Sequence, residues 1–375
     1  MQKIHKRKLR LPNEDELSKE QKDILRLGAS GRYLIIGGPG TGKSVVAALR
    51  AIKYSHLFLA YNKTLIAYMQ QTLKQYDKED IECKTLDSFF FAEYKRIFGQ
   101  NAPTIKEYIP DYDKISEQIL AKDDIKLKYS HLIIDEGQDK PVKYYQALID
   151  YGYENFFIVA DQNQQITEQN SNRQELSTLL ALDAKDVYEL KKNYRNSASI
   201  ARLCEYFYTD TASPKIDIPA DGLYETLPLL YTCDEITICK KILKFRQANP
   251  SYLIAVVTAT NEIQERLYKE LNTNAQSLGC KTLISKYNSD AKQYEIDFSK
   301  AGIVILNDRS IKGLEFEAVF IINDGFKKTS NNPDLLKKRL YVMASRAMKN
   351  LVFVKCGTSN IQELLPKDPN LLRIM

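Results

Sequence analysis

The chain has 375 residues, of which 44% are hydrophobic and 27% are charged, the balance of an ordinary globular protein. No apolar run is long enough to span a membrane, and no apolar segment follows the basic N-terminus as it would in a secretory signal. The formal net charge of +6 argues only weakly for a nucleic-acid partner, because most of it comes from the N-terminal tail, with Lys3, Lys6, Arg7, Lys8 and Arg10.

The length of the chain predicts two domains. Its six cysteines include no C-x-x-C pair, and its three histidines are too scattered for a zinc site. We therefore interpret the cysteines as thiols in a reducing compartment and expect a cytoplasmic protein that does not contact a membrane.

The first predicted elements are a helix and a strand. The helix begins after Ser18, which has the chemistry of an N-cap, and Gln21 stands three residues further on, as in a capping box. An apolar strand follows over residues 33–36.

A glycine-rich loop leads from this strand into a helix-forming stretch. It has the complete G-x-x-x-x-G-K-S pattern, formed by Gly37, Gly38, Pro39, Gly40, Thr41, Gly42, Lys43 and Ser44. Glycines let consecutive backbone N–H groups point into one concavity, and the helix N-terminus adds its positive end. We therefore expect a phosphate loop in which Lys43 reaches the β- and γ-phosphates and Ser44 ligates Mg²⁺. The alternative, an ordinary glycine turn, does not require the whole motif.

Strands and helices alternate along the rest of the chain. Strands are predicted at 56–60, 81–84, 131–134, 156–160 and 187–190, and a second alternating set follows Asn196. This pattern predicts an α/β fold with two mostly parallel sheets flanked by helices. We place the domains at 1–192 and 193–375, with a boundary near 215–225 as the weaker option and with the polar stretch 101–129 as a short insertion.

Polar side chains after the predicted strands are candidates for catalysis, because parallel sheets bind ligands at that edge. Asp135 and Glu136 follow the strand at 131–134, which we expect beside the phosphate-loop strand. Asp135 could hold Mg²⁺ opposite Ser44, and Glu136 could polarise the attacking water. Gln164, after the next strand, could bond both this water and the γ-phosphate. The acidic pair could also be a plain exposed turn.

Two arginines lie outside the first alternating set. If the second domain packs against the first, Arg195 and Arg346 could reach the γ-phosphate and neutralise charge that develops during hydrolysis. Taken singly, either arginine could instead form a surface ion pair.

Together these stretches resemble the superfamily 1 helicases, specifically the UvrD/Rep/PcrA-like branch, in a compact form that lacks the large inserted accessory domains. The resemblance covers nearly the whole chain in the expected order. It is carried by the helix of Gln21, the phosphate loop, and residues 60–63, 85–89, 135–139, 161–164, 190–195, 312–316 and 341–347.

The resemblance implies two RecA-like P-loop NTPase domains with an ATP cleft between them, and stepping along a single strand in the 3′ to 5′ direction. It implies that Gln21 reads the adenine edge, that Tyr194 stacks on the adenine, and that Arg195 and Arg346 are arginine fingers. It also implies nucleotide contacts by Gly313 and Glu315, the latter near the ribose. Nucleic-acid contacts are implied for Tyr61, Asn62, Thr85 and Ser88, and Arg309 is a further candidate.

The nucleic-acid side departs from the family pattern. Thr167 and Gln169 stand where the family has a base-stacking aromatic pair, and Asp87 stands where it has a histidine. The Thr and His that precede Lys312 in the family are replaced by Asn307 and Arg309. Each stacked base contributes about 1–3 kcal/mol, so we expect a weaker or altered grip on the strand.

We therefore expect a DNA helicase or single-stranded DNA translocase that uses ATP and Mg²⁺. Its partners would be single-stranded or tailed DNA, with RNA left open, and a protein such as a nuclease. The alternative is an ATP-driven switch that binds a protein partner with little or no unwinding. A P-loop kinase fits less well, because it has no need of Arg195 and Arg346. The ATPase rate with and without single-stranded DNA discriminates between the helicase or translocase and the ATP-driven switch.

Overall fold

The computed structural model describes residues 5–7, 9, 11–54, 57–107, 109–165, 170–209, 215–220, 222, 225–287, 296–326, 334–357 and 360–375. The chain divides into two compact units. The N-terminal unit comprises Leu11–Lys191 and Asp210–Ile216, and the C-terminal unit comprises Met1–Arg10, Lys192–Thr209 and Asp217–Met375. None of the described helices is both long and apolar enough to cross a bilayer.

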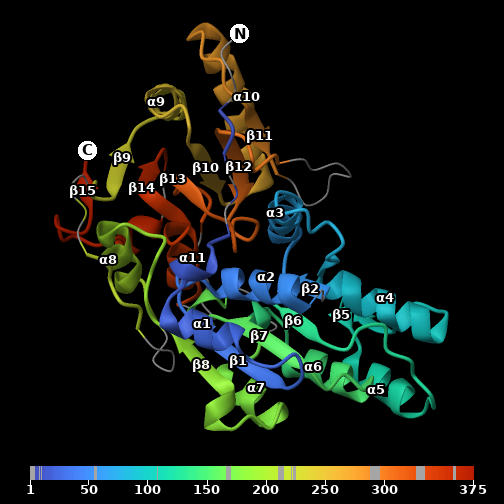
Figure 1. Cartoon of the computed structure of the whole chain (residues 1–375). Coiled ribbons are helices and arrows are strands. Elements are labelled where there is room, and N and C mark those ends of the chain that lie inside the picture. Colours follow the sequence, from blue (N-terminus) through green and yellow to red (C-terminus); the bar gives the residue numbers. More distant parts are fainter. Residues whose placement is uncertain are drawn as a thin grey trace. The chain divides into compact units, whose positions relative to one another are not determined.

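The N-terminal unit is built on a six-stranded sheet in the order β3-β2-β6-β7-β1-β8, in which all neighbouring strands are parallel (Figure 1). Its strands are β1 (Arg32–Gly37), β2 (Leu57–Ala60), β3 (Cys83–Thr85), β6 (Leu132–Ile134), β7 (Phe156–Ala160) and β8 (Val187–Leu190). We expected the strand before Asp135 beside the phosphate-loop strand, and this was wrong. β7 lies between β6 and β1, because β1 pairs with β7 and β8.

Alternate residues of these strands enter two separate cores. Leu34 and Ile36 belong to one core and Ile35 to the other, as the two-residue period of a strand requires. The second core also holds apolar residues of α1 (Lys19–Leu25), α2 (Lys43–Tyr54) and α3 (Lys63–Lys74). The first holds those of α4 (Leu86–Phe98), α5 (Tyr112–Leu120), α6 (Val142–Asp150) and α7 (Arg173–Leu179). Helices therefore cover both faces.

The insertion predicted at 101–129 is short and packed. It forms the antiparallel pair of β4 (Thr104–Lys106) and β5 (Ile109–Pro110), followed by α5. Tyr112, Ile115 and Ile119 of this segment are buried in the same core as Phe90. The segment is thus an extension of the unit's own core.

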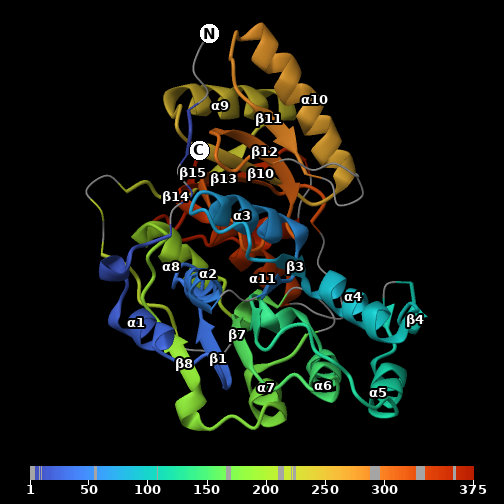
Figure 2. The same ribbon diagram turned by 45° about the vertical axis from the view of Figure 1, so that its right-hand side comes forward.

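The C-terminal unit is built on a seven-stranded parallel sheet in the order β11-β12-β10-β13-β14-β9-β15. The strands are β9 (Leu229–Thr232), β10 (Leu253–Thr258), β11 (Ile284–Lys286), β12 (Gly302–Asn307), β13 (Phe316–Ile322), β14 (Ala347–Lys355) and β15 (Arg373–Ile374). Helices α9 (Glu235–Ala248) and α10 (Asn261–Ser277) share one core with this sheet, as the orange and yellow ribbons of Figure 2 show. Helices α8 (Ala198–Tyr206) and α11 (Leu335–Ala344) contact each other and β14. The predicted α/β architecture with two parallel sheets is confirmed.

The division into units differs from the predicted domains at the N-terminus. The sequence placed the first ten residues in the N-terminal domain, whereas the C-terminal unit contains them. The backbone N–H of Arg7 donates to the carbonyl of Ser299 at 2.6 Å, and that of Ala301 donates to the carbonyl of His5 at 3.0 Å. Part of the basic tail is therefore hydrogen-bonded to a loop before β12, which sequence position alone does not reveal.

Candidate functional site

The phosphate loop joins the carboxyl end of β1 to the first residue of α2, Lys43. Gly40 and Gly42 have φ values of 76° and 89°, which side-chain-bearing residues rarely adopt. The Thr41 hydroxyl donates to the carbonyl of Gly38 at 2.8 Å and fixes the turn. The N-terminus of α2 therefore opens directly onto the loop, as an anion site requires.

Gln21 supports the loop from α1. Its amide oxygen accepts from the backbone N–H of Ser18 at 3.0 Å, and its Nε2 donates to the carbonyl of Thr41 at 3.0 Å. The residue is only 4% exposed. Gln21 thus completes the predicted capping box and ties the helix to the loop, and its contact with adenine stays a prediction.

The ammonium group of Lys43 contacts a carbonyl oxygen and a carboxylate oxygen. Its Nζ donates to the carbonyl of Gly38 at 2.8 Å and lies 3.7 Å from Oδ2 of Asp161. Both side chains are buried. Asp161 follows β7, the strand next to β1, and sequence reasoning did not single it out. The signal was available, since a carboxylate directly after an apolar strand lies at the ligand-binding edge of a parallel sheet.

Asp135 lies at the same edge, after β6. Burial away from water, and then the neighbouring Glu136 carboxylate, raise the pKa of Asp135 to about 6, while Ser44 and Lys43 act in the opposite direction. One oxygen accepts from the backbone N–H of Glu136 at 2.8 Å, and the other finds no hydrogen-bond partner among the described residues. A buried, unpaired carboxylate oxygen close to a serine hydroxyl fits Mg²⁺, which prefers hard oxygen ligands.

A hydrogen-bond network connects the ends of β6 and β7. Gln138 Nε2 donates to Oε2 of Glu136 at 2.6 Å, and the backbone N–H of Asp161 donates to Oε1 of Gln138 at 3.0 Å. Gln164 Nε2 donates to Oδ2 of Asp161 at 2.6 Å. Glu136 has φ 56° and ψ 42°, a left-handed conformation that a glutamate keeps only when its surroundings impose it. Gln138, which sequence reasoning did not choose, holds Glu136 in place.

The C-terminal unit brings its own predicted residues together. Arg195 Nε donates to Oε1 of Glu315 at 2.8 Å, and Gly313, with φ 80°, lies two residues before this glutamate. Nη1 of Arg195 is buried and has no hydrogen-bond partner within the described part of the chain. The guanidinium is therefore oriented while one of its donors remains available.

Asn196 links the segment of Arg195 to that of Arg346. Its side-chain Nδ2 donates to the carbonyls of Ser345 and Ala347, at 3.0 and 2.6 Å. Arg346 is 2% exposed, and its Nη2 donates to the Ser345 hydroxyl at 3.0 Å. Tyr194, in contrast, is 46% exposed, with the ammonium of Lys192 5.1 Å from its ring centroid. Hydrogen bonds therefore hold Arg195 and Arg346 in place, whereas the ring of Tyr194, next to Arg195, faces solvent.

The predicted nucleic-acid residues of the N-terminal unit follow two neighbouring strands, β2 and β3. Asn62 caps α3 by accepting from the backbone N–H of Leu65 at 2.7 Å, and Thr85 caps α4 by accepting from that of Ser88 at 3.2 Å. Tyr61 is half-buried and Ser88 is exposed. These side chains therefore have structural partners at the sheet edge that also carries Asp135.

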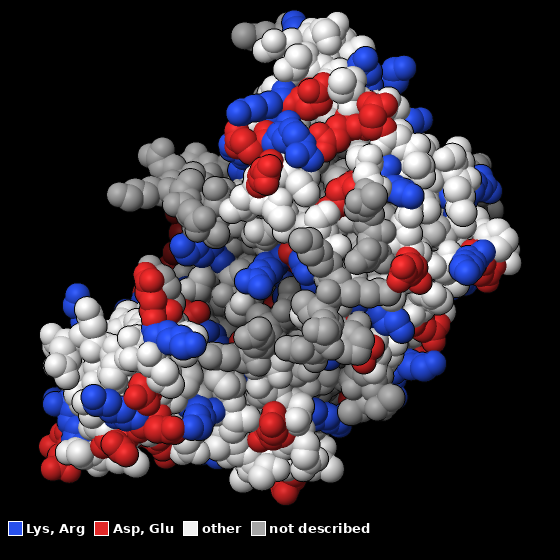
Figure 3. Space-filling view, turned by 180° about the vertical axis from the view of Figure 1, so that it is seen from behind, with Lys and Arg blue, Asp and Glu red and all other residues white. Residues whose placement is uncertain are grey.

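The residues that depart from the family pattern lie in different surroundings. Asp87 forms an ion pair with Lys140. Arg309 is exposed in the C-terminal unit. Thr167 and Gln169 lie outside the described residues. Figure 3 shows Lys and Arg mixed with Asp and Glu on the face that it presents.

Two family models match the chain, one in each unit. Residues 21–170 match an AAA domain, and residues 302–354 match the UvrD-like helicase C-terminal domain. No curated protein matches the sequence. A solved structure, the C-terminal domain of a possible DNA helicase from Lactobacillus plantarum WCFS1, is 17% identical over a match that covers 48% of this chain and 98% of that chain, with a TM-score of 0.34.

Proposed function

The chain belongs to the UvrD-like helicases, and from that premise we propose that it hydrolyses Mg²⁺-ATP and uses the energy to step along single-stranded DNA in the 3′ to 5′ direction. The observation that carries the proposal is the edge of the N-terminal sheet. Lys43, Asp161 and Asp135 meet there, while Asn62 and Thr85 follow strands of the same sheet. A nucleotide site and a strand site on one edge can be coupled by small shifts of the same elements.

The residues of the phosphate loop account for the binding of ATP. Without nucleotide, the charge of Lys43 is balanced by Asp161 and by the Gly38 carbonyl. The β- and γ-phosphates of ATP offer a stronger counter-charge at the N-terminus of α2, so Lys43 transfers to them. Ser44 and Asp135 are the residues that would hold magnesium, which neutralises phosphate charge when it is bound.

Glu136 and Gln164 account for hydrolysis. Glu136 accepts a proton from water as the water oxygen bonds to the γ-phosphorus and the bond to the β-phosphate oxygen breaks. Gln138 orients Glu136, and Gln164 orients the water. Arg195 and Arg346 supply positive charge to the same transition state, a contribution that reaches about 10³–10⁵ in rate in related chemistry.

The small size of the insertion limits the ability of the chain to separate DNA strands as it moves. Strand separation needs a surface against which the duplex is driven, and the described part of the 101–129 interval supplies only a small hairpin and one helix. We therefore propose that the chain alone moves along DNA better than it unwinds it, and that a protein partner supplies the separating surface.

One observation favours the second candidate function, an ATP-driven switch. The family's histidine position is held by Asp87, whose carboxylate is paired with Lys140 and offers a phosphate backbone no hydrogen-bond donor. In a switch, ATP binding would change a protein-binding surface and DNA would have no effect on turnover.

The test is the ATPase rate of the full chain with and without single-stranded DNA. We expect turnover that DNA stimulates, and a loss of about 10²–10⁴-fold in Glu136→Gln with ATP still bound. Lys43→Ala is the control for the phosphate loop. Turnover that is unaffected by DNA would support the switch, and wild-type turnover in Glu136→Gln would contradict the whole assignment.

A further inference from the structure

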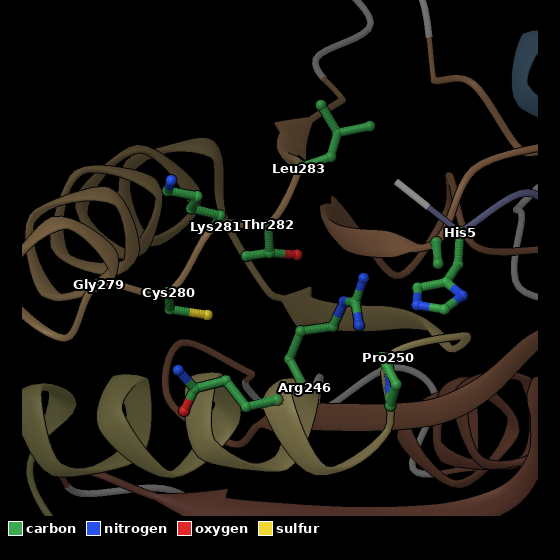
Figure 4. Close-up of a pocket in the computed structure, with 10 residues that line it drawn as sticks. His5, Arg246, Pro250, Gly279, Cys280, Lys281, Thr282 and Leu283 are labelled. Atoms are coloured by element: carbon green, nitrogen blue, oxygen red, sulfur yellow. The ribbon is translucent and has the colours of Figure 1, made fainter. Parts of the chain in front are cut away.

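The C-terminal unit contains a cavity of about 510 Å³ that none of its predicted nucleotide residues lines (Figure 4). Its walls come from the end of α9, from the segment between α10 and β11, and from the residue before β12, with His5 of the N-terminal segment at one side. The cavity therefore lies at the amino ends of β10, β11 and β12. Its volume falls within the range of small-molecule sites, about 300–1,000 Å³.

The lining is cationic. Its fixed positive charge comes from Arg246, while the ammonium of Lys281 points away from Arg246 in Figure 4, and the described residues that line the cavity include no Asp or Glu. Pro250 and Leu283 add apolar surface. This composition favours an anionic ligand with a less polar body, because the positive charges have no carboxylate of the lining to neutralise them.

Arg246 is the central group of this cavity. It lies in the last turn of α9, is 7% exposed, and extends into the cavity in Figure 4. Its Nη1 donates to the carbonyl of Asn249 at 3.1 Å, but its Nε has no hydrogen-bond partner among the described residues. Burial away from water lowers the pKa of Arg246. A buried guanidinium without an anion is costly, and a bound anion removes that cost.

Thr282 is a second polar group without a partner. Its hydroxyl is buried, has no hydrogen-bond partner in the described part of the chain, and faces the same space as Arg246 in Figure 4. Buried hydroxyls are almost always hydrogen-bonded in folded proteins. Two unsatisfied donors that face one cavity therefore indicate an acceptor that belongs there.

We propose that this cavity binds a phosphate monoester. The guanidinium of Arg246 presents a planar pair of N–H donors that matches two phosphate oxygens, and Thr282 donates to a third oxygen. The second negative charge of a phosphate monoester suits a cationic lining better than a carboxylate does. A free sugar phosphate and the 5′-phosphate end of a nucleic-acid strand share this chemistry.

Binding would also involve the N-terminal segment. His5 lines the cavity, and the same segment is anchored by Arg7, whose Nη2 donates to Oε1 of Glu317 at 2.8 Å. The basic tail thus gains a role as one wall of a ligand site.

The test is calorimetric titration of the full chain, in the Lys43→Ala background so that the phosphate loop does not contribute. The probes are ribose 5-phosphate, ribose, inorganic phosphate, and a short oligonucleotide with either a 5′-phosphate or a 5′-hydroxyl. We expect ribose 5-phosphate to bind and ribose not to bind. The 5′-phosphorylated oligonucleotide should bind more tightly than its 5′-hydroxyl form, which still meets the strand site of the N-terminal unit. The source of the phosphate is identified by the probe in which adding the phosphate gives the larger gain in affinity.

Three variants locate the binding. Arg246→Gln should weaken it about tenfold or more, and Thr282→Val, which keeps the shape of the side chain, about threefold to tenfold. Lys244→Gln removes a charge from an exposed position of the same helix and should leave binding unchanged. The proposal would be overturned if Arg246→Gln and Thr282→Val both bound the phosphorylated probe as tightly as the protein without these substitutions. It would also be overturned if inorganic phosphate bound as tightly as the ester.

Discussion

Arg195 and Glu315 form an ion pair inside the C-terminal unit, with Nε of the arginine donating to Oε1 of the glutamate at 2.8 Å. The arginine side chain is 12% exposed, and its buried Nη1 has no hydrogen-bond partner among the described residues. Glu315 therefore orients the guanidinium without satisfying all of its donors. An arginine prepared in this way can contribute charge during the reaction without first losing side-chain freedom.

The first prediction follows from this pair. Arg195→Ala should lower kcat for ATP by about 10³-fold or more and change KM by less than about tenfold, because the charge is needed most in the transition state. Steady-state kinetics and a melting curve measure both effects. The fold should be retained, since Glu315, whose side chain is 33% exposed, stays in contact with water and is not left as a buried unpaired charge. An unchanged kcat would remove Arg195 from the reaction.

Asp161→Asn should separate binding from turnover. The substitution removes the anion beside Lys43, so phosphates meet less competition and ATP should bind as tightly as in the wild type or more tightly. It also disturbs the carboxylate that Gln164 contacts, so kcat should fall about 10- to 100-fold. Equilibrium binding of ATP and single-turnover hydrolysis measure the two effects. Weaker binding with unchanged hydrolysis would contradict this role.

Tyr194→Ala should weaken nucleotide binding by about tenfold, the effect of one lost aromatic stack. Tyr206→Ala is the matched control, because Tyr206 is 45% exposed in the same unit and has no predicted role. Titration with a fluorescent ATP analogue compares the two variants. The stacking role would be excluded by equal affinities in the two variants.

Gly137→Ala should impair both stability and turnover. A Cβ at Gly137 would lie 3.0 Å from the hydroxyl of Tyr145 and against the side chain of Ile158, which displaces the segment that holds Glu136. We expect a loss of about 1–3 kcal/mol in the free energy of unfolding. Gly28→Ala is the control, since its Cβ would meet no atom closer than 3.7 Å. Denaturant unfolding of both variants checks the prediction, which fails if they are equally stable.

The sequence was most informative where a motif is contiguous. The phosphate loop needs a strand, a glycine turn and a helix in immediate succession, and these are local properties. The order of strands in the sheet is not local. β7 lies between β6 and β1, although the polar ends of both β6 and β7 were recognised. Nothing in the residues of β6 distinguishes a direct neighbour of β1 from a strand one position further away.

Several site residues have two chemical uses, and the sequence cannot choose between them. Asn62 and Thr85 are helix caps in the structure, and the same side chains suit contact with a phosphate backbone. Gln21 serves its capping box and also the phosphate loop. The pair of Arg195 and Glu315 joins residues that are far apart in the chain, so only folding reveals it.

The most direct test of ATP-driven movement is the ATPase rate of the full chain as a function of the length of single-stranded DNA. A protein that steps along a strand spends a smaller share of its time at the ends of a longer strand. We therefore predict that the maximal rate, at saturating DNA, rises with length and then levels off, and that Glu136→Gln abolishes this rise. A maximal rate that is the same at every length, and the same without DNA, would contradict movement along a strand.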